Sequence, residues 1–256
     1  MKKLVITAIL LTFVASLAYT QEENIPPIPP KRSRSAKIGA MGGFTPGLLF
    51  VDVDPINKFL IGSGAAPLKD NGVLLYGGAG SAYIMFLPNL RIGGLGMSGS
   101  IKSTSLDAIG IRRDAELHVG FGGVTFEYVI PIQERLDLSV GTMLGGGGID
   151  ITLRQNDGHA KTWQEEFGNF GSGNYQVGGR ITSIKREMSG SFFVVIPSVN
   201  LEYAVLGWIG ARIGVSYVGM YSPSWTLDDK DDLLGVPSNV NGKGFMINAG
   251  LFLGTF

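Results

Sequence analysis

The sequence predicts an all-β fold: an antiparallel, up-and-down transmembrane β-barrel of about eight strands with a narrow lumen that side chains fill. Three observations predict it. Long segments alternate between apolar and polar or small residues, and the connections between these segments alternate between short and long. Glycine, at 39 of 256 residues, has about twice its usual share of about 7%.

The alternation is clearest over residues 192–221. Apolar residues occupy odd positions in 193–205 and in 209–221, whereas Glu202 and Arg212 occupy even positions. A period of two with one apolar face is typical of a strand. The same pattern predicts eight strands, at residues 37–45, 73–86, 90–103, 113–130, 136–153, 191–206, 208–222 and 243–256. Most of them are long enough to cross a bilayer, for which a tilted strand needs about 9–11 residues.

The connections are sorted by length. Three are short, at residues 87–89, 131–135 and around Gly207. Four are long, at residues 46–72, 104–112, 154–190 and 223–242. Short turns at one end and long loops at the other, with an even number of strands, are the plan of an outer-membrane barrel.

Aromatic residues near the strand ends predict two interfacial girdles of the kind found in such barrels. Six are expected on the turn side: Phe86, Phe126, Tyr128, Trp208, Phe252 and Phe256. Six are expected on the loop side: Tyr76, Phe192, Phe193, Tyr217, Tyr221 and Trp225.

With this pattern, residues 37–256 resemble the small bacterial outer-membrane β-barrels, the class that contains the transmembrane domain of outer membrane protein A. The last residues, GLFLGTF, end in Phe256 and are similar to the signal read by the machinery that inserts barrels. The resemblance implies a location in the outer membrane of a diderm bacterium. Its partners would be the lipid bilayer and the insertion machinery.

Residues 1–18 predict a signal peptide, with two lysines, an apolar stretch and small residues at Ser16 and Ala18. An uncleaved membrane anchor is the alternative, but the apolar stretch is shorter than the about 20 residues that a helical span needs. Residues 19–36 predict a Pro-rich periplasmic arm, and residues 37–256 the barrel. The basic cluster of the arm would either contact anionic headgroups or keep the arm solvated.

Glycine pairs interrupt several strands, and at Gly122-Gly123 and Gly145–Gly148 the apolar residues change parity. A change of parity is the mark of one extra residue, so we expect β-bulges there. Strongly coiled strands suit a narrow barrel, and interior glycines leave room for large side chains.

Three charged residues of the strands have the parity of the interior: Glu127, Glu202 and Arg212. We expect them to pair in the lumen, because an outward Arg at the membrane midplane costs about 2–4 kcal/mol. With a three-residue turn centred on Gly207, Glu202 would lie directly opposite Arg212, and a register shift of two would make them diagonal neighbours. The alternative to an ion-pair network is a path for protons or ions.

Loop 46–72 is apolar for an exposed loop and predicts a short helix near residues 54–61, with Asp54 as N-cap and Pro55 at N1. Its buried face would comprise Ile56, Phe59 and Leu60. This helix would form either a packed lid or the entry of a hydrophobic ligand. In loop 154–190, residues 175–187 are expected to extend the neighbouring hairpin beyond the membrane.

Composition and motifs exclude several classes. Lys+Arg and Asp+Glu are both 21, which leaves no basic excess for nucleic acid, and 45% hydrophobic residues argue against disorder. Without cysteine there is no disulfide, thiolate nucleophile or Cys-ligated metal. The two histidines, His118 and His159, lie in no metalloprotease motif, and Asp157 beside His159 is a weak hydrolase signal. The acidic run 228–232 allows a weak cation site or a solvated surface.

We therefore predict no enzyme, cofactor, metal or nucleic-acid partner. The expected function is a structural or surface-interaction role in the outer membrane. The alternative is a narrow channel or a conduit for a small or apolar molecule. A secreted soluble β-protein is a third reading.

Overall fold

The computed structural model describes residues 39–84, 86–108, 110–157, 162–164, 167–168, 176–177, 180–181 and 183–254. The predicted signal peptide, the Pro-rich arm and Phe256 lie outside the described residues, and so does His159.

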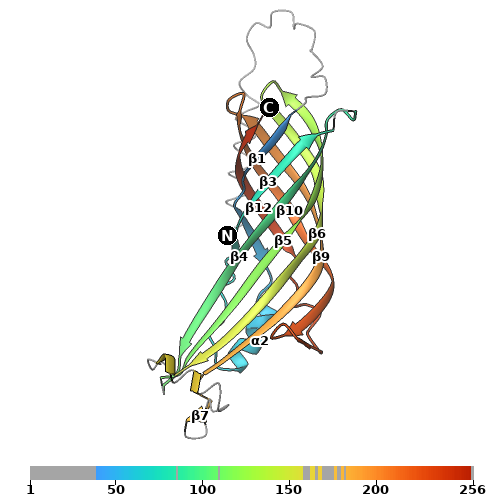
Figure 1. Ribbon diagram of the computed structural model, residues 1–256. Coiled ribbons are helices and arrows are strands. Elements are labelled where there is room, and N and C mark those ends of the chain that lie inside the picture. The colour runs from blue at the N-terminus through green and yellow to red at the C-terminus, as the bar shows by residue number, and fades with distance from the viewer. Residues whose placement is uncertain are drawn as a thin grey trace, which may run out of the picture. The chain divides into compact units, whose positions relative to one another are not determined.

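The described chain forms an antiparallel barrel (Figure 1). Its strands are β1 (Ala40–Phe44), β2 (Gly47–Val51), β3 (Val73–Tyr83), β4 (Leu90–Leu106), β5 (Arg112–Gln133), β6 (Leu136–Asn156), β9 (Ser183–Ala204), β10 (Ile209–Leu227) and β12 (Gly244–Gly254). Each strand pairs with its neighbour along the chain, and β12 pairs with β10 on one side and with β1 and β2 on the other, which closes the ring. Two short pieces complete the list, the β7–β8 pair (Gln176–Val177 and Arg180–Ile181) and β11 (Asp231–Asp232) at the tip of β10.

β1 and β2 are two halves of one strand. Met41 lies opposite Ser81 and Leu49 opposite Val73, which is the same register on β3 before and after the break. The break falls at Pro46, which has no amide N–H to donate to a neighbouring strand. Counted in this way the ring has eight strands, as the sequence predicts, but its first strand reaches beyond the expected residues 37–45.

The outer surface of the turn-side half is apolar. On β12 the side chains of Phe245, Leu251 and Leu253 are exposed. Met246 and Phe252, which lie between them in the sequence, are buried inside the barrel. The alternation thus sends one apolar set outward, where lipid replaces water, and a mixed set inward.

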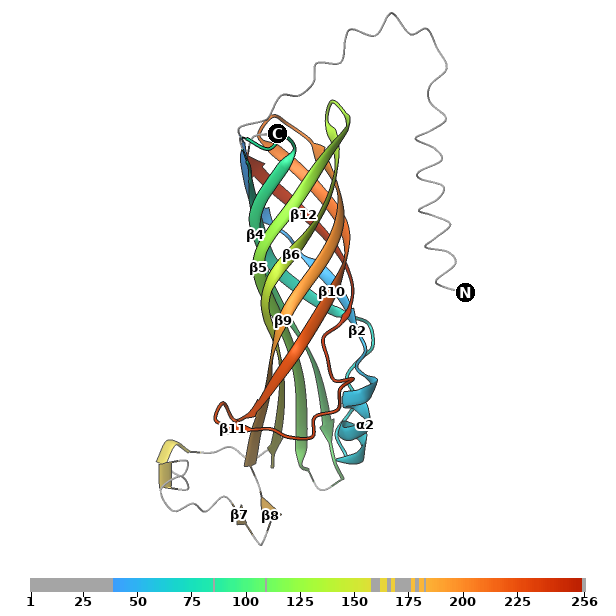
Figure 2. The same ribbon diagram turned by 90° about the vertical axis from the view of Figure 1, so that its right-hand side faces the viewer.

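Three strands are far longer than a bilayer requires. β5 and β9 have 22 residues and β6 has 21, against about 9–11 for a membrane-spanning strand. β3 and β12 on the opposite wall have 11 residues. The long strands therefore leave the barrel on the loop side as a protruding sheet, seen in the lower part of Figure 2. The expected extension of the hairpin is present, since β9 begins at Ser183 and pairs with β6 up to Asn156.

The predicted bulges at Gly122-Gly123 and Gly145–Gly148 are wrong. Their pairing runs through both sites without a shift, from Leu90 opposite Tyr128 to Leu106 opposite Arg112. The apolar parity changes for another reason. Toward the turns the outward residues are apolar because they face lipid, and in the protruding sheet the inward residues are apolar because they face a protein core.

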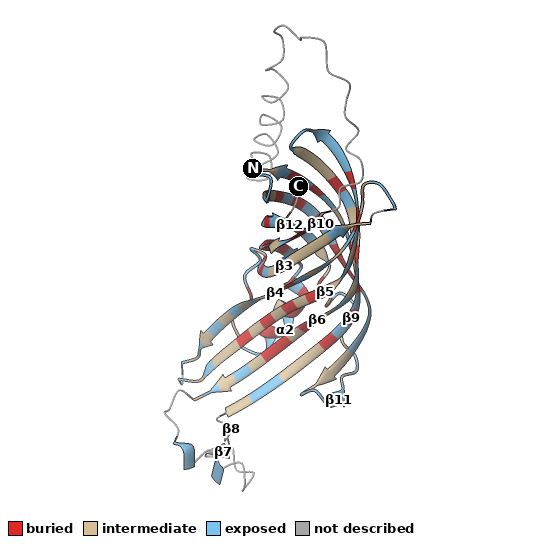
Figure 3. Cartoon of the chain, turned by 45° about the horizontal axis from the view of Figure 1, so that its top comes forward, coloured by how far each residue is buried: buried red, intermediate tan, exposed pale blue. Residues whose placement is uncertain are grey.

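This core fills the loop-side half (Figure 3). The inner face of the protruding sheet contributes residues such as Leu117, Val119 and Ile151. The facing wall ends early, so its place is taken by the α2 segment and by Val240 of the segment before β12. The lumen is therefore packed with apolar side chains at this end.

The helix in loop 46–72 is present as α2 (Asp54–Gly62) and packs on the core. Ile56 and Leu60 belong to the core, but Phe59 is 65% exposed, so its predicted place in the buried face is wrong. Phe59 lies more than a quarter turn around the helix from Leu60 and points to solvent. The N-cap is Val53 and not Asp54, whose N–H bonds to the carboxylate of Asp52 at 3.1 Å. The described residues include no helix long and apolar enough to span a membrane.

The girdle prediction needs three corrections. Phe252 and Phe192 are buried inside the barrel, and Trp225 is half-buried with its ring edge-on to Phe192 at 5.8 Å. Phe252 has the inward parity of β12, and Phe192 that of β9. The other girdle residues that the structure describes have exposed rings.

Candidate functional site

The charged residues predicted for the interior lie in the turn-side half of the lumen. Glu127 on β5, Glu202 on β9 and Arg212 on β10 are all buried. The register sets Arg212 opposite Glu202, and Arg212 Nη2 lies 3.0 Å from Glu202 Oε1. Arg212 Nη1 also donates to Glu127 Oε1 at 3.1 Å, although β6 and β9 separate β5 from β10. One guanidinium thus joins two carboxylates across the lumen.

A fourth residue, Arg91 on β4, completes the group and was not named from the sequence. Arg91 Nη1 donates to Glu202 Oε2 at 2.8 Å. Arg91 Nη2 lies 2.9 Å from Glu127 Oε2, the residue opposite it in the register. We call these four residues, Arg91, Glu127, Glu202 and Arg212, the Arg–Glu cluster. It has two positive and two negative charges, so its formal charge is zero.

Aromatic rings cover the two guanidinium groups of the cluster. The Arg212 guanidinium carbon lies 4.7 Å from the ring centroid of Phe252, and that of Arg91 lies 5.6 Å from the ring centroid of Tyr83. Such cation–π contacts favour a desolvated cation. The inward position of Phe252 therefore serves the cluster, where the sequence predicted a place in the girdle.

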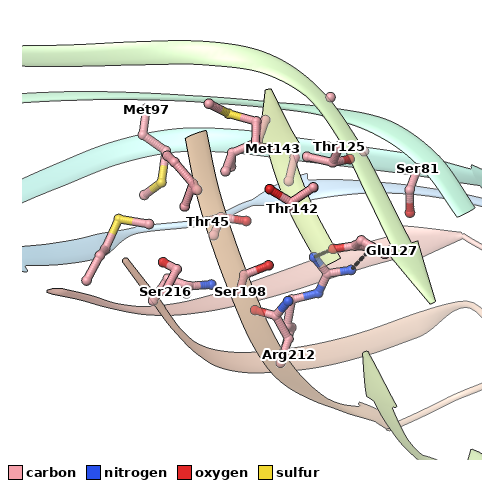
Figure 4. A pocket seen from close by; sticks show the side chains of 18 of the residues that line it. Thr45, Ser81, Met97, Thr125, Glu127, Thr142, Met143, Ser198, Arg212 and Ser216 are labelled. Atoms are coloured by element: carbon pink, nitrogen blue, oxygen red, sulfur yellow. Dashed lines mark hydrogen bonds and ion pairs between the residues drawn. The ribbon is translucent and has the colours of Figure 1, made fainter. Parts of the chain in front are cut away.

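A small polar cavity adjoins the cluster on its loop side (Figure 4). Its volume of about 40 Å³ is room for roughly two or three water molecules. Thr45 Oγ1, Ser216 Oγ and Arg212 Nε are buried there without a hydrogen-bond partner in the protein. Buried polar atoms that lack a protein partner are the groups that ordered water satisfies.

Glycine makes this polar layer possible at one position. A Cβ at Gly214 would lie 2.0 Å from Asn200 Oδ1 and 3.0 Å from Asn248 Oδ1. Gly214 therefore leaves room for two inward amides, as expected from the glycine content. Past this layer Met97, Met143 and other core residues close the lumen.

The acidic run at the tip of β10 gives no metal site. No group of three or more potential ligands gathers within the described parts of the chain. Asp228 instead accepts hydrogen bonds from the Glu187 N–H at 3.0 Å and from Arg186 Nη1 at 2.6 Å. The Glu187 N–H, and after it the Arg186 guanidinium, lower the pKa of Asp228 below its usual range. The pair Asp157 and His159 cannot be placed, because His159 lies outside the described residues.

A closed antiparallel barrel leaves no sheet edge unpaired, and an apolar outer band lets it lie in lipid. In the turn-side half both features are present, since the ring closes through β12 and the outward side chains are apolar. The protein is an integral outer-membrane β-barrel, in the location that the sequence predicts. That it is no enzyme and binds no cofactor stays a prediction.

No protein-family model and no curated protein sequence matches the chain. Solved structures of barrels are similar to it at low identity. They include a major outer membrane protein from Thermus thermophilus, with a TM-score of 0.44, 8% identity, and 85% of this chain and 100% of that chain covered. The N-terminal β-barrel domain of Pseudomonas aeruginosa OprF has a TM-score of 0.38 and 10% identity, with 86% and 98% covered. Ail, the attachment invasion locus protein of Yersinia pestis, has a TM-score of 0.36 and 11% identity, with 84% and 96% covered.

Proposed function

We propose that the protein is a non-conducting outer-membrane barrel that holds a protruding sheet at the cell surface for contacts with other molecules. One observation carries the proposal, namely that the lumen is filled along its length. The Arg–Glu cluster occupies the turn-side half, and the apolar core with α2 occupies the loop-side half. The cavity between them has about 40 Å³, which is room for roughly two or three water molecules.

The outer face of the protruding sheet suits contacts in water. Its charged side chains are of both signs and pair across or along the strands. Lys102 Nζ lies 3.1 Å from Glu116 Oε1, and Arg112 Nε lies 3.0 Å from Asp114 Oδ1. Hydroxyl and charged groups on a regular sheet offer many hydrogen bonds to a protein or glycan partner. They are unsuited to lipid, because charge on the lipid face is costly.

The lumen is tested by conductance of the refolded chain in planar bilayers. We expect no single-channel steps above those of the lipid alone. The double variant Ile56→Gly and Leu60→Gly, which loosens the α2 lid, is the control for a barrel whose loop-side closure is weakened. Stable steps in the wild type, altered in selectivity by Glu202→Gln, would instead support the narrow channel that the sequence left as an alternative.

The orientation is tested with single cysteines, because the chain has none of its own. Ser100 is exposed on the outer face of the protruding sheet, and Gln133 is exposed next to a short turn. A membrane-impermeant maleimide added to intact cells should label Ser100→Cys and spare Gln133→Cys until the outer membrane is permeabilised. The reverse labelling would place the sheet in the periplasm and refute a role at the cell surface.

A further inference from the structure

A second and larger cavity lies at the loop-side end of the barrel, beside the tip of β10. The pairing of β12 with β10 ends at Gly244 opposite Val218, while β10 continues to Leu227. The chain between β11 and β12 runs past this free part of β10, as Figure 2 shows. Ser222 has a φ of 54°, and the register of β10 shifts between Tyr221 and Ser224. Strand and loop stand apart here and enclose a pocket of about 520 Å³.

The pocket is apolar where it is deepest. Phe192, Met220 and Val240 form its floor and are all buried. Trp225 and Tyr221 line the β10 side, and residues 233–237 line the loop side. A volume of this size, lined by aromatic and aliphatic side chains, is typical of small-molecule sites, which span about 300–1,000 Å³.

One cation stands at the end of this pocket that is nearer the membrane. Lys243 Nζ lies 4.9 Å from the ring centroid of Tyr221, whose side chain belongs to the exposed loop-side girdle. Across the described residues, no carboxylate lies within ion-pair distance of Lys243. Asp232, at the opposite end beside Thr226, is negative. The two ends therefore differ in charge, and an anionic group is favoured only at the Lys243 end.

We propose that this pocket binds an anionic amphiphile, with its apolar chain on the Phe192, Met220 and Val240 floor and its carboxylate or phosphate head at Lys243. The apolar floor supplies the burial that holds a chain, and Lys243 supplies a charge-assisted hydrogen bond to the head. Tyr221 of the loop-side girdle sets the mouth at the membrane interface, where such molecules are concentrated. The site shares no lining residue with the cavity beside the Arg–Glu cluster and does not depend on the surface-contact role.

The test uses Trp225 as a reporter inside the pocket. The chain has three tryptophans, and Trp163 and Trp208 are both exposed, so Trp163→Phe with Trp208→Phe leaves Trp225 as the sole emitter. The probes are 9,10-dibromostearate, whose bromines quench tryptophan, and its uncharged methyl ester. The protein is studied in detergent micelles. We expect saturable quenching by both probes, with the acid binding about tenfold more tightly, as one charge-assisted hydrogen bond provides.

Lys243→Met should remove the preference for the acid and leave the affinity for the ester unchanged. Lys230→Met, at an exposed lysine of the β10–β11 turn, is the matched control and should change neither. In nanodiscs of brominated phosphatidylglycerol, quenching that depends on Lys243 would assign the ligand to a membrane lipid. Quenching only after the free acid is added would assign it to a free amphiphile.

Three results would overturn the proposal: no quenching, quenching that rises with bromine in the micelle without saturating, or an equal loss of acid and ester binding in Lys243→Met.

If the tryptophan variant does not fold, Ser224→Phe in the otherwise native chain answers the same question. Ser224 is exposed and lines the pocket, so its replacement by Phe fills the space. Titration calorimetry with stearate should then show binding in the wild type and its loss in the variant, and equal binding by both chains would refute the site.

Discussion

Removing two opposite charges of the Arg–Glu cluster together should cost much less unfolding free energy than the sum of the losses from removing each alone. Glu202→Gln leaves two guanidinium groups with a single carboxylate, and Arg212→Met leaves two carboxylates with a single guanidinium. Each single variant buries an uncompensated charge, for which about 3–5 kcal/mol of unfolding free energy is expected to be lost. Arg212→Met should be at the lower end, because Arg91 still donates two hydrogen bonds to Glu202.

The double variant restores neutrality. Arg91 and Glu127 remain, with Arg91 Nη2 and Glu127 Oε2 2.9 Å apart. The double variant should therefore lose much less unfolding free energy than the two single variants together, with a coupling energy of about 1–3 kcal/mol. The assay is reversible urea unfolding in lipid vesicles, followed by tryptophan fluorescence for all four proteins.

The matched control is the exposed pair of Lys102 and Glu116 on the protruding sheet. Their charged atoms lie 3.1 Å apart, much like those of the cluster, but Lys102 is 65% exposed. The same cycle with Lys102→Met and Glu116→Gln should give a coupling of less than about 1 kcal/mol. Strict additivity at Glu202 and Arg212 would refute the reasoning, because it would mean that the two charges do not compensate each other.

Three further predictions concern the membrane band, the lid and the β9–β10 tip. Val215→Arg, on the lipid-facing side of β10, should lower the unfolding free energy in vesicles by about 2–4 kcal/mol. Thr104→Arg, on the polar outer face of the protruding sheet, should change it by less than about 0.5 kcal/mol. Similar losses in the two variants would contradict the membrane boundary. Leu60→Ala should destabilise the α2 region by about 2–5 kcal/mol in amide exchange over residues 54–62, while Phe59→Ala should have little effect; equal effects would show that α2 presents another face. The pKa of Asp228 is lowered, so its stabilising contribution is present above about pH 3.9, the ordinary pKa, and is lost as the pH falls through the lower folded value. Exchange of the Glu187 amide should therefore become faster in acid, and Asp228→Asn should abolish this pH dependence. A pH profile that is the same in the variant would exclude the contact.

The barrel could be predicted from the sequence because lipid and lumen impose opposite demands on alternate residues. That contrast persists over the lipid-facing part of each strand and marks the number of strands. The Glu202–Arg212 register was within reach for a related reason. Their strands are joined by a short turn, and even pairing sums leave few registers open. The same logic places α2, since Asp-Pro before an apolar stretch marks a helix start to within one residue.

Arg91 could not be found in this way. Its partner Glu127 lies on the next strand, but the sequence predicts a long connection at 104–112, which leaves the register open. That length is wrong, because β4 runs to Leu106 and β5 begins at Arg112, so only residues 107–111 connect the two strands. The contact between Arg91 and Glu202 is harder still, because it crosses the lumen between strands that are not neighbours. Contacts across a lumen depend on how the ring closes. The alternation of residues along one strand carries no information about that closure. The pocket beside β10 was missed as well, since it arises where two strands end at different heights.

The parity change, which in the sequence suggests a bulge, locates the edge of the bilayer. Where a strand passes out of lipid, its apolar residues must move from the outer to the inner face, because water replaces lipid outside and a protein core replaces the polar lumen inside. The outward apolar residues extend over 124–132 on β5, 193–203 on β9 and 245–253 on β12. Each of these spans is close to the about 9–11 residues that a tilted strand needs to cross a membrane, although the strands themselves differ twofold in length. Because these spans agree among strands from different walls, one flat band of lipid accounts for all three spans. Residues 112–122 of β5, on the loop side of that band, therefore stand in water. Gly120 and Gly122, at the outer edge of that band, carry no side chain that would have to suit either lipid or water.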